Sequence, residues 1–290
     1  MFTRIKKSMA DFSELVMFKH SVFSLPFIFI AMLVASYDQS GSGWFGWRLL
    51  LLGTLAALFA RNFAMGVNRL LDRDVDILNP RTKGRPSVDG RVSYLQMVVF
   101  IVTNAILFIV VAYFVNILAL QLSLPILAVL AAYTLFKRFS ALAHIILGIS
   151  LGLAPIAGVV AVSGEITLWS CYLALGVMFW VAGFDLLYSL QDIDFDKAQG
   201  LHSIPSRFGA QKTMWIARVF HFLTIVFWTL FVYTAGLGLW AQLALLFSAI
   251  MLAYEHILVN KDFTKIDKAF FTVNGYLGFV FLMLIVLEVL

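Results

Sequence analysis

The 290-residue chain has a net charge of +5, and 62% of its residues are hydrophobic while only 13% are charged. Ordinary globular proteins have about 45–50% apolar and about 25% charged residues, so this composition excludes a soluble domain. The mean hydropathy of +0.94 predicts a polytopic protein whose partner is the lipid bilayer, and its basic residues then indicate membrane topology rather than nucleic-acid binding.

Nine apolar windows follow one another along the chain, each bounded by charges, Gly or Pro. A helix needs about 20 apolar residues to span a membrane, and runs such as LFIVVAYFVNILAL lack the alternation of a barrel strand. We therefore predict an all-α protein with nine transmembrane helices, at residues 21–38, 46–67, 93–115, 117–135, 142–163, 167–189, 213–235, 237–258 and 268–288. The first window is too long for a cleavable signal peptide, so we expect it to be retained.

Lys and Arg are distributed unevenly between the two sides of this arrangement. If the N-terminus is cytoplasmic, 18 of the 21 basic residues fall in the N-terminal segment or in cytoplasmic loops. This asymmetry follows the positive-inside rule and predicts a cytoplasmic N-terminus in the plasma (inner) membrane. Two cytoplasmic loops, about 68–92 and 190–212, are long, and we expect them to cap a single transmembrane domain over 1–290 that surrounds a central cavity.

Dense acidic clusters occur in these two long loops. In the first, NRLLDRDVD, residues Asn68, Asp72 and Asp76 are spaced four apart, which places them on one face of a helix at the end of the second span. Asp74 falls off that face. The spacing therefore predicts a row of three oxygen-bearing side chains at the membrane edge.

The second cluster, YSLQDIDFD, repeats the spacing at the end of the sixth span. Tyr188, Asp192 and Asp196 are again four residues apart, and Asp194 points away from them. Asp185 falls on the Asp192 face, deeper in the membrane. The repetition predicts a second row that matches the first.

Two matched rows of oxygen ligands suit Mg²⁺, which proteins usually hold with one or two carboxylates plus substrate phosphate oxygens. We predict that bridging Mg²⁺ ions hold a diphosphate between the rows, and that the metal ligands and catalytic residues are Asn68, Asp72, Asp76, Asp192 and Asp196. In the alternative without a metal site, the acids are solvated and pair with neighbouring Arg side chains. The occurrence of the same four-residue spacing in both loops disfavours this alternative. Without an HExxH motif, a Cys/His cluster or a P-loop, zinc and nucleotide sites have no support.

These motifs resemble those of the UbiA superfamily of intramembrane prenyltransferases. NRLLDRDVD is similar to the NxxxDxxxD motif of that family, and QDIDFD to its second DxxxD. The resemblance extends over nearly the whole chain, through FKHSVFSLPF, NPRTKGRP, YTLFKRFSALAHIILGISLGLAP and DKAQGLHSIPSRFG. It is strongest toward 4-hydroxybenzoate polyprenyltransferases and related quinone-pathway enzymes, although this chain has His144 where many of those enzymes carry Gln.

The resemblance implies a nine-helix bundle around a central cavity, Mg²⁺ as the cofactor, and two small-molecule partners. These are a polyprenyl diphosphate donor and an aromatic acceptor of the 4-hydroxybenzoate type, used in ubiquinone or menaquinone biosynthesis. Prenylation of a dihydroxynaphthoate for menaquinone is an alternative, because such an enzyme would look similar. No obligate protein partner is expected.

Basic residues near the motifs are expected to bind the substrates beside the metal. Arg61 lies about two helical turns before Asn68 on nearly the same face, where it either contacts diphosphate or acceptor or pairs with Asp185. Lys137 and Arg138 occupy the family's KR position. In the first long loop, we expect one of Arg81, Lys83 and Arg85 to contact the diphosphate while the others set topology.

Two further residues complete the predicted substrate site. Tyr188 is expected to steady a prenyl cation through its ring face. Asp185 is open to three roles: support of a metal ligand, partner of Arg61, or proton acceptor. For His20, His144 and His202, a structural role and acceptor contact both remain open.

A membrane transporter is the competing function from another class. It predicts ionisable groups spread across the depth of the membrane, whereas here they concentrate at one face. A membrane scaffold without catalytic activity would not need the duplicated Asp spacing. The sequence therefore favours the enzyme.

Overall fold

Helices form all of the regular structure in the computed structural model, which describes residues 10–16 and 25–290. Within this part of the chain, eight helices are long and apolar enough to cross a membrane, and α2 is a shorter apolar helix. The nine are α2 (Leu25–Ser40), α3 (Trp47–Leu71), α5 (Tyr94–Val115), α6 (Ile117–Phe136), α7 (Ala143–Ser163), α8 (Leu168–Tyr188), α10 (Ile204–Thr234), α11 (Leu239–Lys261) and α13 (Asn274–Val289). The short helix before α13 lengthens this last span to Phe270–Val289. The predicted all-α membrane fold is confirmed.

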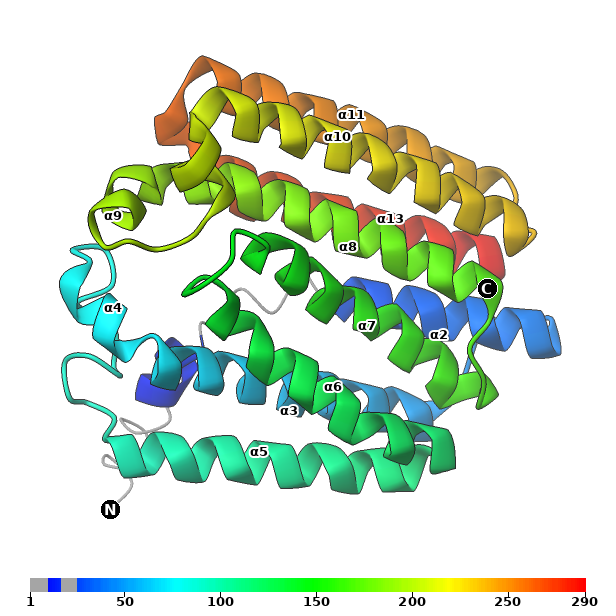
Figure 1. Cartoon of the computed structure of the whole chain (residues 1–290). Helices are drawn as coiled ribbons and strands as arrows, with labels where there is room; N and C mark the ends of the chain where they lie inside the picture. The colour runs from blue at the N-terminus through cyan, green and yellow to red at the C-terminus, as the bar shows by residue number, and fades with distance from the viewer. Residues whose placement is uncertain (1–9, 17–24) are drawn as a thin grey trace.

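Short helices occupy the connections between the long ones. They are α4 (Arg73–Leu78), η2 (Ser189–Asp192), α9 (Ile193–Ala198), η3 (Phe263–Lys265), α12 (Ile266–Lys268) and the π-helical η4 (Ala269–Val273). The long predicted loops are therefore partly helical. α4 and α9 lie at the same end of the bundle, at the left of Figure 1, although more than 100 residues separate them.

One helix begins earlier than the sequence indicated. α10 starts at Ile204 rather than near residue 213, because Ser203 caps it by accepting a hydrogen bond from Ser206 N and a Pro occupies its first turn. Gly209, with φ 77° and ψ 169°, then kinks the helix before its apolar part. The sequence analysis placed this helix by its apolar run, and the residues between the cap and that run are polar, so its true start was missed.

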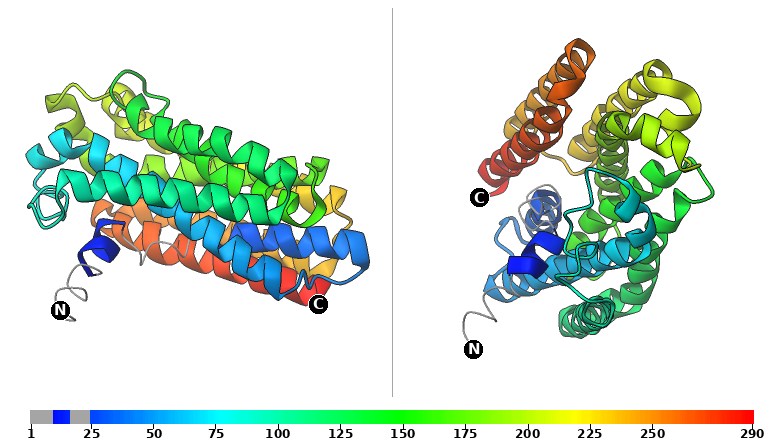
Figure 2. Two further views of the ribbon diagram at one scale, coloured as in Figure 1. Left: turned by 90° about the horizontal axis from the view of Figure 1, so that it is seen from below. Right: turned by 90° about the vertical axis from the view of Figure 1, so that its left-hand side faces the viewer.

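α8 is the central helix of the bundle, and it packs most extensively against α10 and α7 (Figure 1). Large aromatic side chains fill the core around it. The ring of Phe27 lies 5.0 Å from that of Trp180 and 5.1 Å from that of Trp228, which in turn lies 5.1 Å from Phe281. These contacts join α2, α8, α10 and α13, and the end-on view in Figure 2 shows how the long helices run alongside one another.

Glycines bring α7 close to its neighbours. A Cβ at Gly148 would lie 2.3 Å from the backbone oxygen of Met178 on α8, and one at Gly152 would lie 2.8 Å from that of Ala174. On the other side, a Cβ at Gly158 would meet the backbone oxygen of Ile28 on α2 at 2.6 Å. Backbone approaches this short tolerate only glycine, so these positions fix where α8 lies relative to α7.

Candidate active site

The first acidic motif lies where α3 gives way to α4. Asp72, between the two helices, has φ −89° and ψ 1°, so the motif is not the single continuous helix that the spacing predicted. Helical hydrogen bonds still cross the break, from Asp72 N to Asn68 O at 2.9 Å and from Asp76 N to Asp72 O at 2.8 Å. As a result, Asn68, Asp72 and Asp76 line one cavity, and Asp74 does not.

The second motif has the same construction. α8 ends at Tyr188, a 3₁₀ turn follows, and Asp192, with φ −103° and ψ 6°, precedes the short helix α9. Tyr188, Asp192 and Asp196 line the same cavity as the first motif, whereas Asp194 is exposed and does not line it. The break at the middle Asp of each motif escaped the sequence analysis, because i, i+4 spacing carries no sign of it.

The cavity that these residues share has a volume of about 520 Å³. Both motifs lie at the end of the bundle where α4 and α9 are found (Figure 1). The remaining walls are mostly apolar and come from α2, α3, α5, α6, α7 and α8. They include Ile28, Ala56, Ala60, Phe108, Ile126, Leu130, Leu147, Leu151, Ala154 and Val181.

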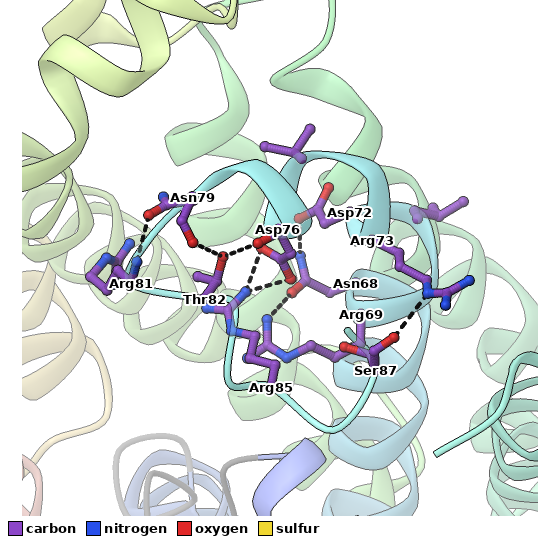
Figure 3. A network of polar contacts seen from close by, with 12 residues as sticks. Asn68, Arg69, Asp72, Arg73, Asp76, Asn79, Arg81, Thr82, Arg85 and Ser87 are labelled. Atoms are coloured by element: carbon purple, nitrogen blue, oxygen red, sulfur yellow. Dashed lines mark hydrogen bonds and ion pairs between the residues drawn. The ribbon is translucent and has the colours of Figure 1, made fainter. Parts of the chain in front are cut away.

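Basic side chains hold the acids of the first motif, and Figure 3 shows the contact between Arg85 and Asp76. Lys137 Nζ donates to Asp72 Oδ2, which also accepts from Asn68 Nδ2 at 2.9 Å. Arg85 Nη1 donates to both carboxylate oxygens of Asp76, at 2.7 and 2.6 Å. Two of the predicted substrate-binding residues, Lys137 and Arg85, therefore lie directly against the acids.

Arg81 connects the two motifs. It belongs to the loop after α4, yet its Nη2 donates to Asp192 Oδ2 at 2.6 Å and its Nη1 to Tyr188 Oη at 2.9 Å. Its guanidinium also lies 5.4 Å from the centre of the Tyr188 ring. In the second motif, Asp196 accepts a hydrogen bond of 2.7 Å from Ser203 Oγ. The loop of one motif therefore closes over the acids of the other.

The two neighbouring acids of the first motif differ in their electrostatics. Burial raises the pKa of Asp72 above its ordinary value, although Lys137 acts in the opposite direction. Asp74 lies outside the cavity, where its hydrogen bonds with Arg138 lower its pKa. The motif therefore contains one shielded carboxylate that faces the cavity and one solvated carboxylate that faces away.

The residues present fit a Mg²⁺ site shared with a substrate. Over residues 10–16 and 25–290, no three His, Cys, Asp or Glu side chains come close enough to form a complete metal cage. Mg²⁺ does not need one when phosphate oxygens complete its coordination. Asp72 Oδ1 is buried and lacks a hydrogen-bond partner among the described residues, so this oxygen is available to a cation.

Asn68 takes part in this site through its amide group. Arg69, itself buried, donates from Nη1 to Asn68 Oδ1 at 2.8 Å and from Nε to Leu15 O at 3.2 Å. The amide nitrogen of Asn68 then points to Asp72 (Figure 3). In this arrangement Asn68 orients Asp72 through its amide nitrogen, while its oxygen accepts one hydrogen bond from Arg69 and keeps a second lone pair.

Arg61 on α3 and Asp185 on α8 also line the cavity, each about two helical turns from an acidic motif. Asp185 Oδ2 is 2.7 Å from Nδ1 of His144, a residue for which the sequence left the role open. His202 also lines the cavity, near the second motif, while His20 lies outside the described residues.

Two of the expected substrate-binding residues do not line the cavity. Arg138 is exposed, and it holds both carboxylate oxygens of Asp74 and the backbone oxygen of Leu71. Lys83 is exposed in the loop after α4. The off-face Asp74 accounts for the position of Arg138, since it offers this side chain a partner on the outer surface.

Some contacts of the site were missed in the sequence. Ser203, which bonds Asp196, has the signal of a helix cap, a Ser two residues before Pro, and this signal predicts the start of α10 but not the contact with Asp196. The pairing of Arg81 with Asp192 had no such signal, because a single sequence does not report contacts between residues far apart in the chain. The contact between Arg69 and Asn68 joins adjacent residues, and the four-residue spacing gave no sign of it because adjacent residues of a helix do not face each other.

Comparison with known proteins identifies related chains of similar length. A 4-hydroxybenzoate octaprenyltransferase from Janthinobacterium sp. (strain Marseille) is 28% identical over 80% of this chain and 81% of its own length. One from Albidiferax ferrireducens is also 28% identical, over 83% of this chain and 81% of the relative.

Solved structures share the fold. The apo structure of a UbiA homolog from Aeropyrum pernix K1 has 30% sequence identity and a TM-score of 0.83, over 93% of this chain and 98% of that one. A UbiA homolog from Archaeoglobus fulgidus bound to GPP and Mg²⁺ has a TM-score of 0.72 at 18% identity, over 95% of this chain and 99% of that one. The UbiA prenyltransferase family itself matches residues 24–285. This multi-pass integral membrane protein therefore belongs to the UbiA prenyltransferase family.

Proposed function

We propose that the protein transfers a polyprenyl group from polyprenyl diphosphate to the ring of a 4-hydroxybenzoate-type acceptor, in ubiquinone or menaquinone biosynthesis. The observation that carries this proposal is that two acidic motifs line one end of a single cavity whose other walls are mostly apolar. A substrate with a charged head and a long apolar tail needs such a site. The relatives named 4-hydroxybenzoate octaprenyltransferase support the choice of acceptor.

Asp72, Asp76, Asp192 and Asp196 would hold Mg²⁺ together with the diphosphate, and Asn68 would orient Asp72 or join the ligands. Bound Mg²⁺ would supply Lewis-acid neutralisation of the leaving diphosphate. The orphaned Asp72 Oδ1 supports this assignment, as does the Mg²⁺ in the homolog from Archaeoglobus fulgidus.

The basic residues that now hold the acids would bind the diphosphate. Lys137, Arg85 and Arg81 each pair with a motif carboxylate, so metal binding at those carboxylates would free their charges for phosphate oxygens. Tyr188, beneath Arg81, would face the developing prenyl cation.

The apolar part of the cavity would exclude water from the prenyl cation until the ring attacks it. Arg61 and Asp185, at the inner end of the polar region, would contact the acceptor. Arg138 and Lys83, which lie outside the cavity lining, would reach the substrates only if the loops moved.

We also propose that the motif end of the bundle faces the cytoplasm across the plasma (inner) membrane. The positive-inside distribution of Lys and Arg supports this orientation. The whole chain would then act as one transmembrane prenyltransferase domain, with the substrate diphosphate entering from the cytoplasmic side.

The test is to incubate the purified protein in lipid nanodiscs with a labelled polyprenyl diphosphate, Mg²⁺ and a panel of aromatic acids, and to identify products by mass spectrometry. We expect prenylated 4-hydroxybenzoate, no product in EDTA, and recovery when Mg²⁺ is restored. Product formed only from a dihydroxynaphthoate would contradict the proposed acceptor. No product from any aromatic acid would contradict the proposed function.

A further inference from the structure

A histidine and an aspartate form a pair in the cavity beyond the metal motifs. His144 lies in the first turn of α7 and Asp185 in the last turn of α8, and both line the cavity. His144 Nδ1 is 2.7 Å from Asp185 Oδ2. The imidazole is only 6% exposed, and its other nitrogen, Nε2, has no hydrogen-bond partner among the residues that the structure describes.

This contact decides which ring nitrogen carries the hydrogen. A carboxylate only accepts hydrogen bonds, so Nδ1 of a neutral imidazole must be the donor to Asp185. Nε2 then has a free lone pair. An imidazole held by a carboxylate in this way is a common arrangement for a general base that takes a proton from a reacting molecule. The carboxylate orients the imidazole and stabilises the imidazolium that forms.

The position of the pair suits the aromatic acceptor rather than the diphosphate. Asp185 precedes Asp192 by seven residues, about two helical turns or about 10 Å farther from the motif end. The surrounding cavity wall includes Leu147, Leu151 and Phe184. An apolar ring next to the first carbon of the prenyl chain would lie in this part of the cavity.

The carboxylates of the motifs are poorly placed to serve as the base. Asp72, Asp76 and Asp192 are held by Lys137, Arg85 and Arg81. Under the proposed function, the same carboxylates hold Mg²⁺. Nε2 of His144, in contrast, has no hydrogen-bond partner among the described residues.

We propose that His144, oriented by Asp185, accepts the proton that the aromatic ring loses when it is prenylated; this assignment rests on the proposed function. The bond between the prenyl carbon and the diphosphate oxygen breaks, and its electron pair leaves with the diphosphate. A ring carbon bonds to the prenyl carbon. The C–H bond at that ring carbon then breaks, its electrons restore the aromatic ring, and the proton moves to His144 Nε2.

The test compares turnover of 4-hydroxybenzoate with and without deuterium at the ring positions beside the hydroxyl group. In the wild-type protein, proton removal by His144 is fast, and we expect an isotope effect on kcat close to unity. In His144→Ala, kcat should fall by about 10²–10⁴-fold, the usual contribution of a general base, and the isotope effect should rise clearly above unity. Added imidazole should raise kcat and bring the isotope effect back down.

Two further variants separate this role from a structural one. Asp185→Asn keeps the size of the partner but weakens control of the imidazole, so it should also lower kcat and raise the isotope effect, with donor KM little changed. His256→Ala removes an imidazole that contacts His221 outside the cavity lining, and it should alter neither the isotope effect nor the response to imidazole.

If the His144→Ala protein is active and its isotope effect is unchanged, the assignment is overturned. A rise in the acceptor KM alone would also overturn it, because His144 would then bind the acceptor rather than take its proton. If the wild-type protein prenylates no deuterated or undeuterated acceptor, the proposed function fails and the assignment fails with it. If the wild-type protein turns over the acceptor but the isotope effect of His144→Ala stays at the wild-type value, the assignment is refuted while the proposed function stands.

Discussion

Asp72 and Asp74 are two residues apart in the chain but differ in burial and in their basic partners. The Asp72 side chain is 4% exposed and faces the cavity beside Lys137, while that of Asp74 is 63% exposed and held by Arg138. The helix breaks at Asp72, and this break leaves Asp72 on the cavity side and Asp74 on the outer side. Of these two carboxylates, only Asp72 can exchange a basic partner for a metal ion inside the cavity.

This difference predicts unequal effects of two equivalent substitutions. Asp72→Asn should lower kcat/KM by more than about 100-fold, because it removes a proposed metal ligand, and support of such ligands alone is worth about 10–100-fold. Asp74→Asn, the matched control, should cost less than about 10-fold, since its contact with Arg138 is an exposed ion pair. Steady-state kinetics at saturating Mg²⁺ measure both, and comparable losses would contradict the assignment of the cavity face.

At the scale of helices, the packing of α7 against α8 determines where the second motif lies. Gly148 and Gly152 allow the two backbones to approach, and α8 leads directly into η2 and α9, which carry Asp192 and Asp196. Gly158 joins the other side of α7 to α2. The position of the second motif relative to α7 therefore depends on glycines that are remote from the chemistry.

Gly148→Ala tests this dependence. Its Cβ would lie 2.3 Å from a backbone oxygen of α8, so the helices must separate, at a cost of about 1–3 kcal/mol. We expect a lower Tm in detergent and lower activity. Gly278→Ala on α13 is the matched control, because its Cβ would meet Pro26 at 3.4 Å, an ordinary contact. Equal thermal stability of the two variants would show that α7 and α8 are not in close contact at Gly148.

At the scale of the whole molecule, the helical spans could be predicted because the membrane requires long apolar runs, and these are visible in the sequence. Predicted windows such as 117–135 and 142–163 fall within one residue of α6 and α7. The start of α10 could not be predicted from hydropathy, since its first turns are polar and end in the kink at Gly209.

The candidate site was predictable in part for the same reason. Four-residue spacing separates Asp72 from Asp74 and Asp192 from Asp194, and the cavity lining follows this division. The partners of the acids follow from how the loops fold back, as in the pair of Arg81 with Asp192, and local spacing does not encode them. The loop that follows one motif thus closes over the other, which makes the two motifs parts of one site.

A double-mutant cycle between Asp72→Asn and Asp192→Asn tests this unity most directly. The readout is the affinity for Mn²⁺, used in place of Mg²⁺ and followed by EPR, in the presence of an unreactive prenyl diphosphate analogue. If the two carboxylates serve one metal–diphosphate complex, each single substitution weakens binding by about 10-fold or more, and the double variant binds far more tightly than the product of the two losses predicts. Losses that multiply would mean that the two motifs bind metal independently, and would contradict the account.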